Sequence, residues 1–344
     1  MKKLLRVVLI LSGLVVVLAG VFIVGARILH PWPPVPDATV QITPARVARG
    51  RYLANHVARC IGCHSQPDYT RYSMPPVPGT EGEGGRYFGD DDEPGLTYAE
   101  NITPARIGNW TDGELIRAIT GGVAKGNKPL HPLMPFYWLK HMDPEDVNST
   151  VAYIRSLKPI DHAVPPTVYY FPLNLILWTI PTAWVATETD GPPAPGPKPS
   201  PADKVAYGRY LSTLAECDMC HGPEDTSAHP IPADLFEGGQ AMRAEASLDH
   251  RFNWVVSANL TPHETGLGSM TQDHFVALFK EYATDDARNR RQAPTDLQTA
   301  MPWAEFSGMT DDDLRAIYQY LRTLKPICNE VDEVFPSASP APAP

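Results

Sequence analysis

An internal repeat constrains the fold of this 344-residue chain more than any other feature of its sequence. Three blocks of sequence occur twice in the same order. The pairs are GRYLANHVARCIGCH (50–64) with GRYLSTLAECDMCH (208–221), NITP (101–104) with NLTP (259–262), and the segments 134–160 with 301–327. The second copy of the first block has one residue fewer before its first cysteine. A repeat of this extent indicates that a whole domain was duplicated, so we expect each half to fold as its own unit.

Proline-rich and apolar segments mark the expected boundaries. TDGPPAPGPKPSPAD (189–203) resists helix and sheet and favours an extended linker. The apolar run 168–186 contains two prolines too close together for a membrane span, so we expect it to pack on or between the domains. The predicted parts are an N-terminal anchor (1–30), domain one (40–165), an apolar packing segment with the linker (166–203), domain two (204–330) and a disordered tail (331–344).

Helix start signals recur in both halves, whereas alternating strand patterns are nearly absent. Thr111 and Glu114 have the spacing of a capping box. The last helix of each half is predicted to begin at a similar signal, within 142–147 and within 309–314, and apolar residues then follow at helical spacing. The sequence therefore predicts an all-α fold.

The N-terminus combines three cations with a long uncharged run. Lys2, Lys3 and Arg6 precede the run from Val7 to Ala26, which is about 20 residues long. That length suits a helix that crosses the hydrocarbon core, and the cations would stay on its cytoplasmic side. We therefore expect a single-pass protein of the bacterial inner membrane with its other domains in the periplasm. A cleaved secretory signal is the alternative.

Charge and cysteine usage narrow the class of partner. The formal net charge is −10, which argues against a nucleic-acid partner because phosphate binding relies on clustered cations. Four of the five cysteines lie in the two Cys-x-x-Cys-His motifs, and only Cys328 is left over. Disulfide bonds are therefore not expected to hold the fold together.

The two Cys-x-x-Cys-His motifs carry the chemistry. Their residues are Cys60, Cys63 and His64 in the first half and Cys217, Cys220 and His221 in the second. On a helix, positions i, i+3 and i+4 share one face, so two thiols can form thioethers with the vinyl groups of a haem while the imidazole ligates its iron. A redox dithiol does not need the histidine, and a zinc site needs a second ligand pair. The motifs predict two covalently bound haem c groups.

The sixth iron ligand decides between electron transfer and catalysis. Met134 and Met301 align in the repeat, and each precedes a proline just before the last helix of its half. Met142 and Met309 also align, but their position favours a packing role at the start of that helix. We therefore predict Met134 and Met301 as the ligands, with Met142, Met309, His131 or a vacant iron as alternatives. Two closed irons would relay electrons.

These motifs give the chain a family resemblance. GRYL…CIGCH, NITP…WTDGEL, MPF and YIRSLKPI resemble class I cytochrome c domains, and their order is similar to the multihaem cytochrome c subunits of periplasmic alcohol and gluconate dehydrogenases. The resemblance covers about residues 45–330 and implies two tandem class I cytochrome c domains after one N-terminal transmembrane helix. Those subunits typically carry three haems, whereas this chain has two motifs.

The resemblance implies an electron-transfer subunit rather than an enzyme. The expected partners are redox proteins that donate or accept electrons: a dehydrogenase, a quinol-oxidising complex, a soluble cytochrome, an oxidase or a reaction centre. The competing hypothesis is a di-haem enzyme, either a cytochrome c peroxidase or a thiosulfate-oxidising cytochrome. A peroxidase needs an open iron, and a thiosulfate-oxidising type would place a cysteine at the sixth position. A structural subunit with incidental haems is a third hypothesis.

Overall fold

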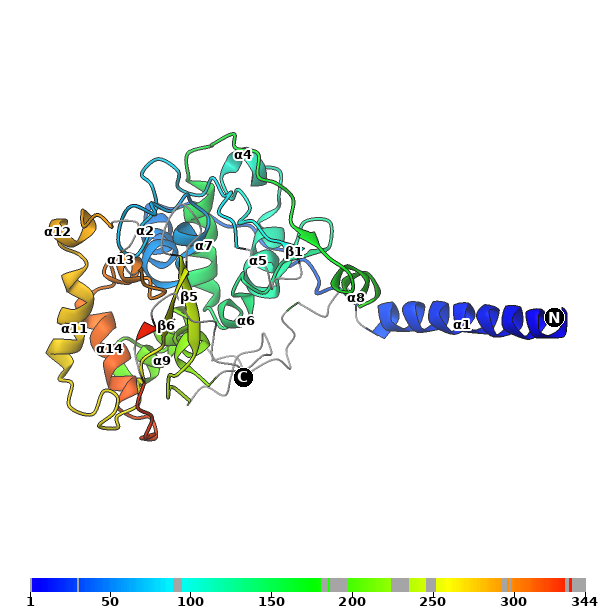
Figure 1. The fold of residues 1–344 in the computed structure, drawn as a ribbon. Helices are drawn as coiled ribbons and strands as arrows, with labels where there is room; N and C mark the ends of the chain where they lie inside the picture. Colours follow the sequence, from blue (N-terminus) through cyan, green and yellow to red (C-terminus); the bar gives the residue numbers. More distant parts are fainter. Residues whose placement is uncertain are drawn as a thin grey trace.

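The computed structural model describes residues 2–29, 31–88, 95–180, 185, 197–223, 235–245, 252–292, 296, 298–331 and 334–335. This part of the chain is rich in helices (Figure 1). The helices of the first half are α1 (Lys2–Leu29), α2 (Pro44–Tyr52), the π-helix η1 (Leu53–Val57), α3 (Cys60–Cys63), α4 (Pro104–Ile107), α5 (Asp112–Gly121), α6 (Phe136–Leu139) and α7 (Pro144–Arg155). The later helices are α8 (Leu173–Thr179), α9 (Lys204–Leu214), α10 (Cys217–His221), α11 (Gln272–Glu281), α12 (Asp285–Arg288), α13 (Trp303–Phe306) and α14 (Asp311–Leu321).

Short antiparallel strands accompany the helices, so the all-α prediction is confirmed only as a helix-rich fold. The strands are β1 (Gly95–Leu96) with β4 (Val168–Tyr169), β2 (Val123–Ala124) with β3 (Lys128–Pro129), and the sheet of β5 (Ala241–Glu245), β6 (Phe252–Val256) and β7 (Val334–Phe335). The β5–β6 pair is the longest, with Ala241 opposite Val256 and Glu245 opposite Phe252. Strand β7 lies inside the segment that was predicted as a disordered tail, and the rest of the tail from 336 onward lies outside the described residues.

The helix starts agree with the sequence prediction. Thr111 accepts a hydrogen bond from the backbone N–H of Glu114, whose side chain bonds back to the Thr111 N–H, so the capping box is present. Asp143 caps α7 and Thr310 caps α14 in the same way through their side-chain oxygens. These caps satisfy backbone N–H groups that have no partner within the helix.

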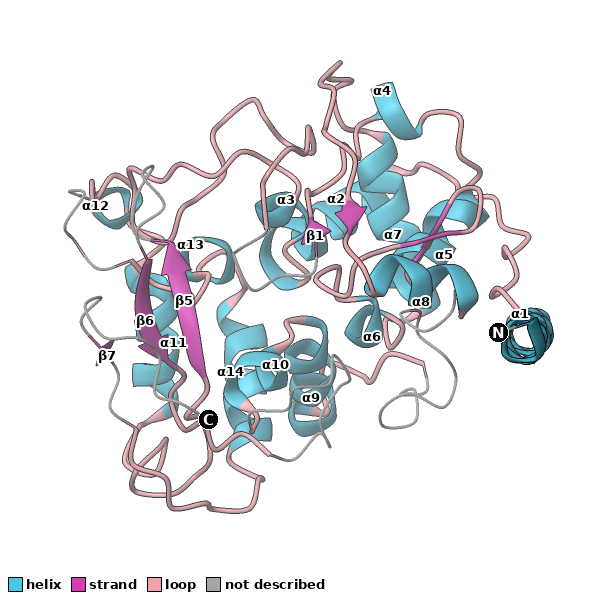
Figure 2. Ribbon diagram, turned by 45° about the vertical axis from the view of Figure 1, so that its right-hand side comes forward, coloured by secondary structure: helices cyan, strands magenta, loops and turns pink. Residues whose placement is uncertain are grey.

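The same helix pair packs in each half. Helix α2 packs against α7, and α9 packs against α14. A glycine allows each close approach: a Cβ at Gly50 would lie 1.9 Å from the Ser149 carbonyl oxygen, and one at Gly208 would lie 1.9 Å from that of Ala316. Both glycines belong to the repeated GRYL block. Figure 2 shows α9, α10 and α14 grouped together beside the group of α2, α3 and α7.

The extra residue of the first half is found in a π-helical turn. Helix α2 continues into η1 before α3 begins, whereas α9 runs as one α-helix to Leu214. A π-turn accommodates one additional residue without breaking the helix. The two halves can therefore differ by one residue before the first cysteine and still present their motifs in the same way.

The buried apolar core does not separate the two halves. One cluster contains Leu53 and Val151 from the first half together with Leu211 and Leu314 from the second. All four side chains are fully buried. Among the buried residues that the structure describes, the main core is shared by both halves, and the tandem-domain division stays a prediction.

Helix α1 extends away from the rest of the chain (Figure 1). A membrane span needs about 20 consecutive apolar residues in one helix. Among the residues described here, no helix is both long enough and apolar enough to cross a membrane. This finding contradicts the prediction of a single-pass inner-membrane protein with an N-terminal anchor.

The segment after the first half is partly buried. In α8, Leu173 and Leu177 are buried, while Trp178 is 60 % exposed, and Phe171 just before the helix is 78 % exposed. Strand β4 pairs with β1 of the first half. Most of the expected linker lies outside the described residues, which resume at 197.

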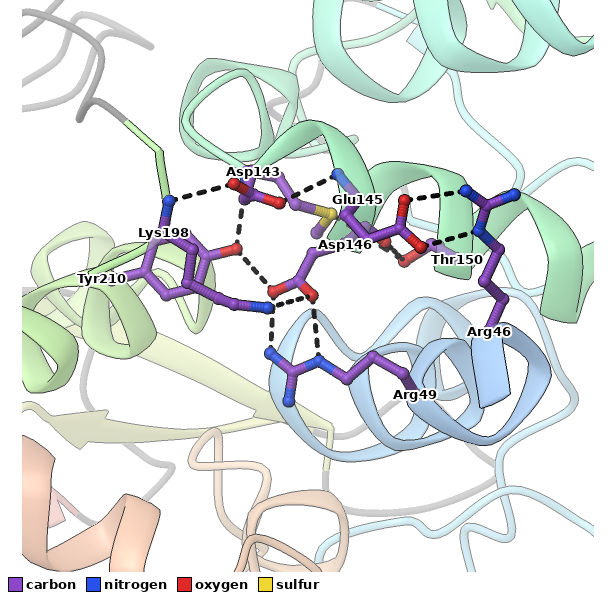
Figure 3. A network of polar contacts seen from close by, with 9 residues as sticks. Arg46, Arg49, Asp143, Glu145, Asp146, Thr150, Lys198 and Tyr210 are labelled. Atoms are coloured by element: carbon purple, nitrogen blue, oxygen red, sulfur yellow. Dashed lines mark hydrogen bonds and ion pairs between the residues drawn. The ribbon is translucent and has the colours of Figure 1, made fainter. Parts of the chain in front are cut away.

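Asp146 joins three parts of the chain (Figure 3). Its carboxylate accepts hydrogen bonds from Arg49 on α2 at 2.7 and 3.0 Å, from Lys198 after the linker at 2.9 Å, and from the Tyr210 hydroxyl on α9 at 2.8 Å. An equivalent bond joins the first half to the second: the Tyr52 hydroxyl on α2 donates to the Asp313 carboxylate on α14 at 2.5 Å. In each half, the tyrosine of the GRYL block therefore donates a hydrogen bond to an aspartate of the other half.

Candidate haem-attachment sites

Each Cys-x-x-Cys-His motif forms one short helix with the same entry. Arg59 precedes α3 with a backbone φ of 48°, and Glu216 precedes α10 with a φ of 56°. This left-handed conformation is uncommon for residues other than glycine, so its occurrence at both equivalent positions indicates a shared local fold. The His64 N–H donates to the Cys60 carbonyl at 2.9 Å, which carries the helical turn through the motif.

The motif histidines have matching hydrogen-bond partners. His64 Nδ1 lies 2.6 Å from the Glu100 carbonyl oxygen, and His221 Nδ1 lies 2.7 Å from that of Ala258. A carbonyl can only accept, so Nδ1 carries the proton and the lone pair is on Nε2. Burial lowers the pKa of both imidazoles, which favours the neutral form. Neutral imidazoles with a fixed tautomer suit iron ligation through Nε2.

The repeated NITP and NLTP blocks hold those two carbonyls in place. The Asn101 side-chain amide donates to the Ile160 carbonyl at 2.8 Å, and Asn259 donates to the Ile327 carbonyl at 2.8 Å. Each asparagine directly follows the residue whose carbonyl meets the histidine. The blocks therefore tie the histidine partner to the chain that follows the last helix. The repeat of these blocks was evident from the sequence, whereas their contact with the motif histidines depends on the fold.

The four motif thiols are half-buried and unpaired. Burial raises the pKa of Cys60 to about 12 and that of Cys220 to about 11. Neutral thiols of this kind do not match a redox dithiol, which needs a lowered pKa. Within the described ranges there is also no group of three His, Cys, Asp or Glu side chains that could hold a metal ion by themselves. Covalent attachment of a haem remains as the chemistry that uses both thiols and the histidine.

The predicted methionine ligands occupy the same turn in both halves. The Phe136 N–H donates to the Met134 carbonyl at 2.8 Å, and the Trp303 N–H donates to that of Met301 at 2.9 Å. Both methionine side chains are half-buried at the edge of the core. Ligation by Met134 and Met301 stays a prediction.

The three alternative ligand residues have packing or hydrogen-bond contacts of their own. Met142 and Met309 are 5 % and 1 % exposed and belong to the apolar core. His131 Nδ1 accepts the N–H of Leu133 at 3.2 Å, and its ring stacks on Tyr169. Because that bond occupies the Nδ1 lone pair, the proton of the neutral His131 is on Nε2.

Each motif helix presents two cysteines for covalent attachment of a haem and a histidine whose Nδ1 is held by a backbone carbonyl. No family model matches the chain. It is 27 % identical over 292 residues to the cytochrome c subunit of a quinone alcohol dehydrogenase from Gluconacetobacter polyoxogenes, and 26 % identical over 291 residues to the fructose dehydrogenase cytochrome subunit from Gluconobacter japonicus. These alignments cover 82 % and 81 % of the chain, but 57 % and 52 % of those subunits.

A third relative matches the chain in length. It is a di-haem c-type cytochrome from Cereibacter sphaeroides, 25 % identical over 332 residues, and the alignment covers 90 % of this chain and 97 % of that protein. All three relatives are cytochromes, two of them from dehydrogenases. Together with the two attachment sites, this similarity assigns covalently bound haem c, with its iron, as the cofactor of the chain.

Proposed function

We propose that the chain is a di-haem c-type cytochrome that relays single electrons as a subunit or partner of a dehydrogenase. In this proposal residues 40–165 and 204–330 each form a class I cytochrome c domain. The observation that carries it is the pair of motif histidines, each with Nδ1 held by a backbone carbonyl at the same place in its half. The close helix contacts at Gly50 and at Gly208, which recur at equivalent positions, support the same division into two domains.

The residues of this chain hold the haems and restrict what they can do. Cys60 and Cys63 would anchor one haem and His64 would bind its iron, and the second half repeats the set. The haem supplies an iron that gains or loses one electron. Met134 and Met301 would close the remaining positions, so that no substrate could bind to either iron. A closed iron restricts the site to electron transfer.

The names of the relatives support a dehydrogenase as one partner. Two relatives are cytochrome subunits of alcohol and fructose dehydrogenases, and the chain spans little more than half of each. A catalytic dehydrogenase subunit would thus donate electrons to this chain. We propose a second redox protein as the acceptor.

The optical spectrum of the oxidised protein tests this proposal. We expect two haems per chain by haemochrome assay and a methionine–iron charge-transfer band in the far red. Met134→Leu and Met301→Leu should each remove about half of that band, since leucine keeps the volume but lacks sulfur. The matched controls Met142→Leu and Met309→Leu should keep it.

Two outcomes contradict the proposal. A haem count other than two would refute the di-haem assignment. A high-spin signal from one haem of the parent at neutral pH would show an open iron and favour a di-haem enzyme. Loss of the band in the Met142→Leu or Met309→Leu protein would refute the ligand assignment alone.

A further inference from the structure

The two haem-attachment helices meet through a buried ion pair. Arg59 and Glu216 occupy equivalent positions, each directly before the first cysteine of its motif. The Arg59 guanidinium lies 3.2 Å from a Glu216 carboxylate oxygen, and the side chains are 19 % and 5 % exposed. The guanidinium also lies over the Phe306 ring, 5.4 Å from its centroid. Opposite charges thus stand at the same place beside two otherwise matched sites.

A second pair of charged groups repeats this asymmetry. Arg86 donates to the carbonyl of Gly62, inside the first motif, at 3.2 Å. Asp218 lies inside the second motif, is 7 % exposed and accepts a hydrogen bond from the Trp138 indole at 2.9 Å. The first motif therefore has Arg59 and Arg86 beside it, and the second has Glu216 and Asp218. Because Arg59 and Glu216 are paired, each also acts electrostatically on cysteines of the other motif. Glu305, which is buried near Gly62, opposes the pattern at the first motif.

Several atoms of these charged groups are buried without a hydrogen-bond partner among the residues that the structure describes. They are Arg59 Nε, Arg86 Nε, Glu216 Oε1 and Glu305 Oε2. A charge that is neither neutralised by several hydrogen bonds nor exposed to water acts over a longer distance, because the surrounding dielectric constant is low. These charges are thus placed to act on whatever the motifs hold.

Charge beside a haem changes the potential at which its iron is reduced. The oxidised iron carries one more positive charge than the reduced iron, so a neighbouring cation favours reduction and a neighbouring carboxylate opposes it. Buried charges are screened little by salt. Two haems with the same ligands would then differ in potential because of the residues around them.

We propose that the Arg59–Glu216 pair, reinforced by Arg86 and Asp218, raises the reduction potential of the first-half haem above that of the second-half haem. An electron that enters the chain then comes to rest on the haem at Cys60 and Cys63. Arg59 and Glu216 ligate neither iron. They determine which of the two haems has the higher reduction potential. This inference rests on the proposed attachment of one haem to each motif.

A spectroelectrochemical titration of the full chain tests this inference at about pH 8, where Asp218 and Glu216, whose pKa values burial raises to about 6 and about 7, are mainly ionised. The potential that changes in the Met134→Leu protein identifies the first-half haem. We expect that haem to have the higher potential in the parent. The gap should narrow in the charge-balanced Arg59→Gln/Glu216→Gln variant and narrow further in the reversed variant Arg59→Glu/Glu216→Arg.

The matched control removes an exposed ion pair of the same composition. Arg46 and Glu145 are bonded at 2.7 Å on the surface of α2 and α7. Arg46→Gln/Glu145→Gln should leave the gap unchanged, because exposed charges are screened. If the Arg59 and Glu216 variants do not load two haems, Asp218→Asn provides the test, since asparagine can still accept the Trp138 hydrogen bond. Asp218→Asn should raise the reduction potential of the second-half haem.

The outcomes separate this inference from the function proposed above. A haem count of two with an unchanged gap in the charge variants, or a gap that widens, overturns the inference and leaves the electron relay intact. A higher potential for the second-half haem in the parent also overturns it. A count other than two haems in the parent protein refutes the proposed function itself.

Discussion

Neighbouring carboxylates on α7 differ in their environment (Figure 3). Asp146 is fully buried and bonded to Arg49, Lys198 and Tyr210, whereas Glu145 is exposed and bonded only to Arg46 among these residues. A buried charge that loses its counter-charge leaves the remaining ion unpaired in a low-dielectric site. An exposed partner is solvated by water instead.

Asp146→Asn should therefore destabilise the protein much more than Glu145→Gln. We expect a loss of about 3 kcal/mol in the free energy of unfolding for Asp146→Asn, because the half-buried Arg49 and Lys198 lose the buried carboxylate that they share. Glu145→Gln should change stability little. Urea unfolding at neutral pH measures both, and equal losses would contradict the role given to Asp146.

The same aspartate predicts how stability depends on pH. Burial alone would raise the pKa of Asp146, but the hydrogen bonds and charges of Arg49, Lys198 and Tyr210 outweigh it and hold the pKa below its usual value. A carboxyl whose pKa is lowered by folding stabilises the protein above its unfolded pKa of about 3.9 and loses that contribution as the pH falls through its folded pKa. The stability difference between parent and Asp146→Asn should shrink below about pH 4 in urea titrations. A constant difference would contradict this pairing.

At the scale of single elements, helix caps have a predictable effect on stability. Thr111 satisfies two backbone N–H groups at the start of α5 together with Glu114. Thr111→Ala should cost about 1 kcal/mol of the free energy of unfolding. Thr284, which caps the four-residue helix α12 where no residue is buried, is the control. Thr284→Ala should have a smaller effect in urea unfolding, and a larger one would contradict the ranking.

Local signals explain which elements could be predicted. Caps and helical spacing depend on residues three or four apart, and so the starts of α5, α7 and α14 were evident from the sequence. The β5–β6 pair was missed because its register depends on backbone hydrogen bonds between strands rather than on a clear alternation. The extra residue before Cys60 was visible, but its accommodation in a π-turn was not.

The candidate site shows the same division between local and distant information. The cysteines and histidines were predicted because their spacing within one helix is the signal. The carbonyls of Glu100 and Ala258 could not be assigned, since they lie more than 30 residues away and depend on the fold. The ion pair of Arg59 with Glu216 joins the two halves and has no sequence signature at all.

At the scale of the whole molecule, reciprocal contacts couple the halves. Tyr52 and Tyr210 each donate a hydrogen bond to an aspartate of the other half, and each hydroxyl also accepts a backbone N–H there. Tyr52→Phe/Tyr210→Phe leaves Asp313 and Asp146 without these donors. We expect calorimetry to show one unfolding transition for the parent and a broader or split transition for the double variant.

The control for this prediction is a tyrosine that bonds within one half. The Tyr318 hydroxyl donates to the Met270 carbonyl at 2.7 Å, and both residues belong to the second half. Tyr318→Phe should lower the transition temperature without splitting the transition. A split in this control, or none in the double variant, would show that these hydroxyls do not couple the halves.

The pairing of Arg59 with Glu216 has a consequence for how such a molecule can be built. In a two-fold dimer of identical subunits, a position that meets its own copy across the symmetry axis carries the same residue on both sides. Two arginines or two glutamates would repel each other there. Two copies that differ in sequence, as the two halves of this chain do, can place opposite charges at that position. Once duplicated copies diverge in sequence, a contact between equivalent positions can carry a positive charge on one side and a negative charge on the other.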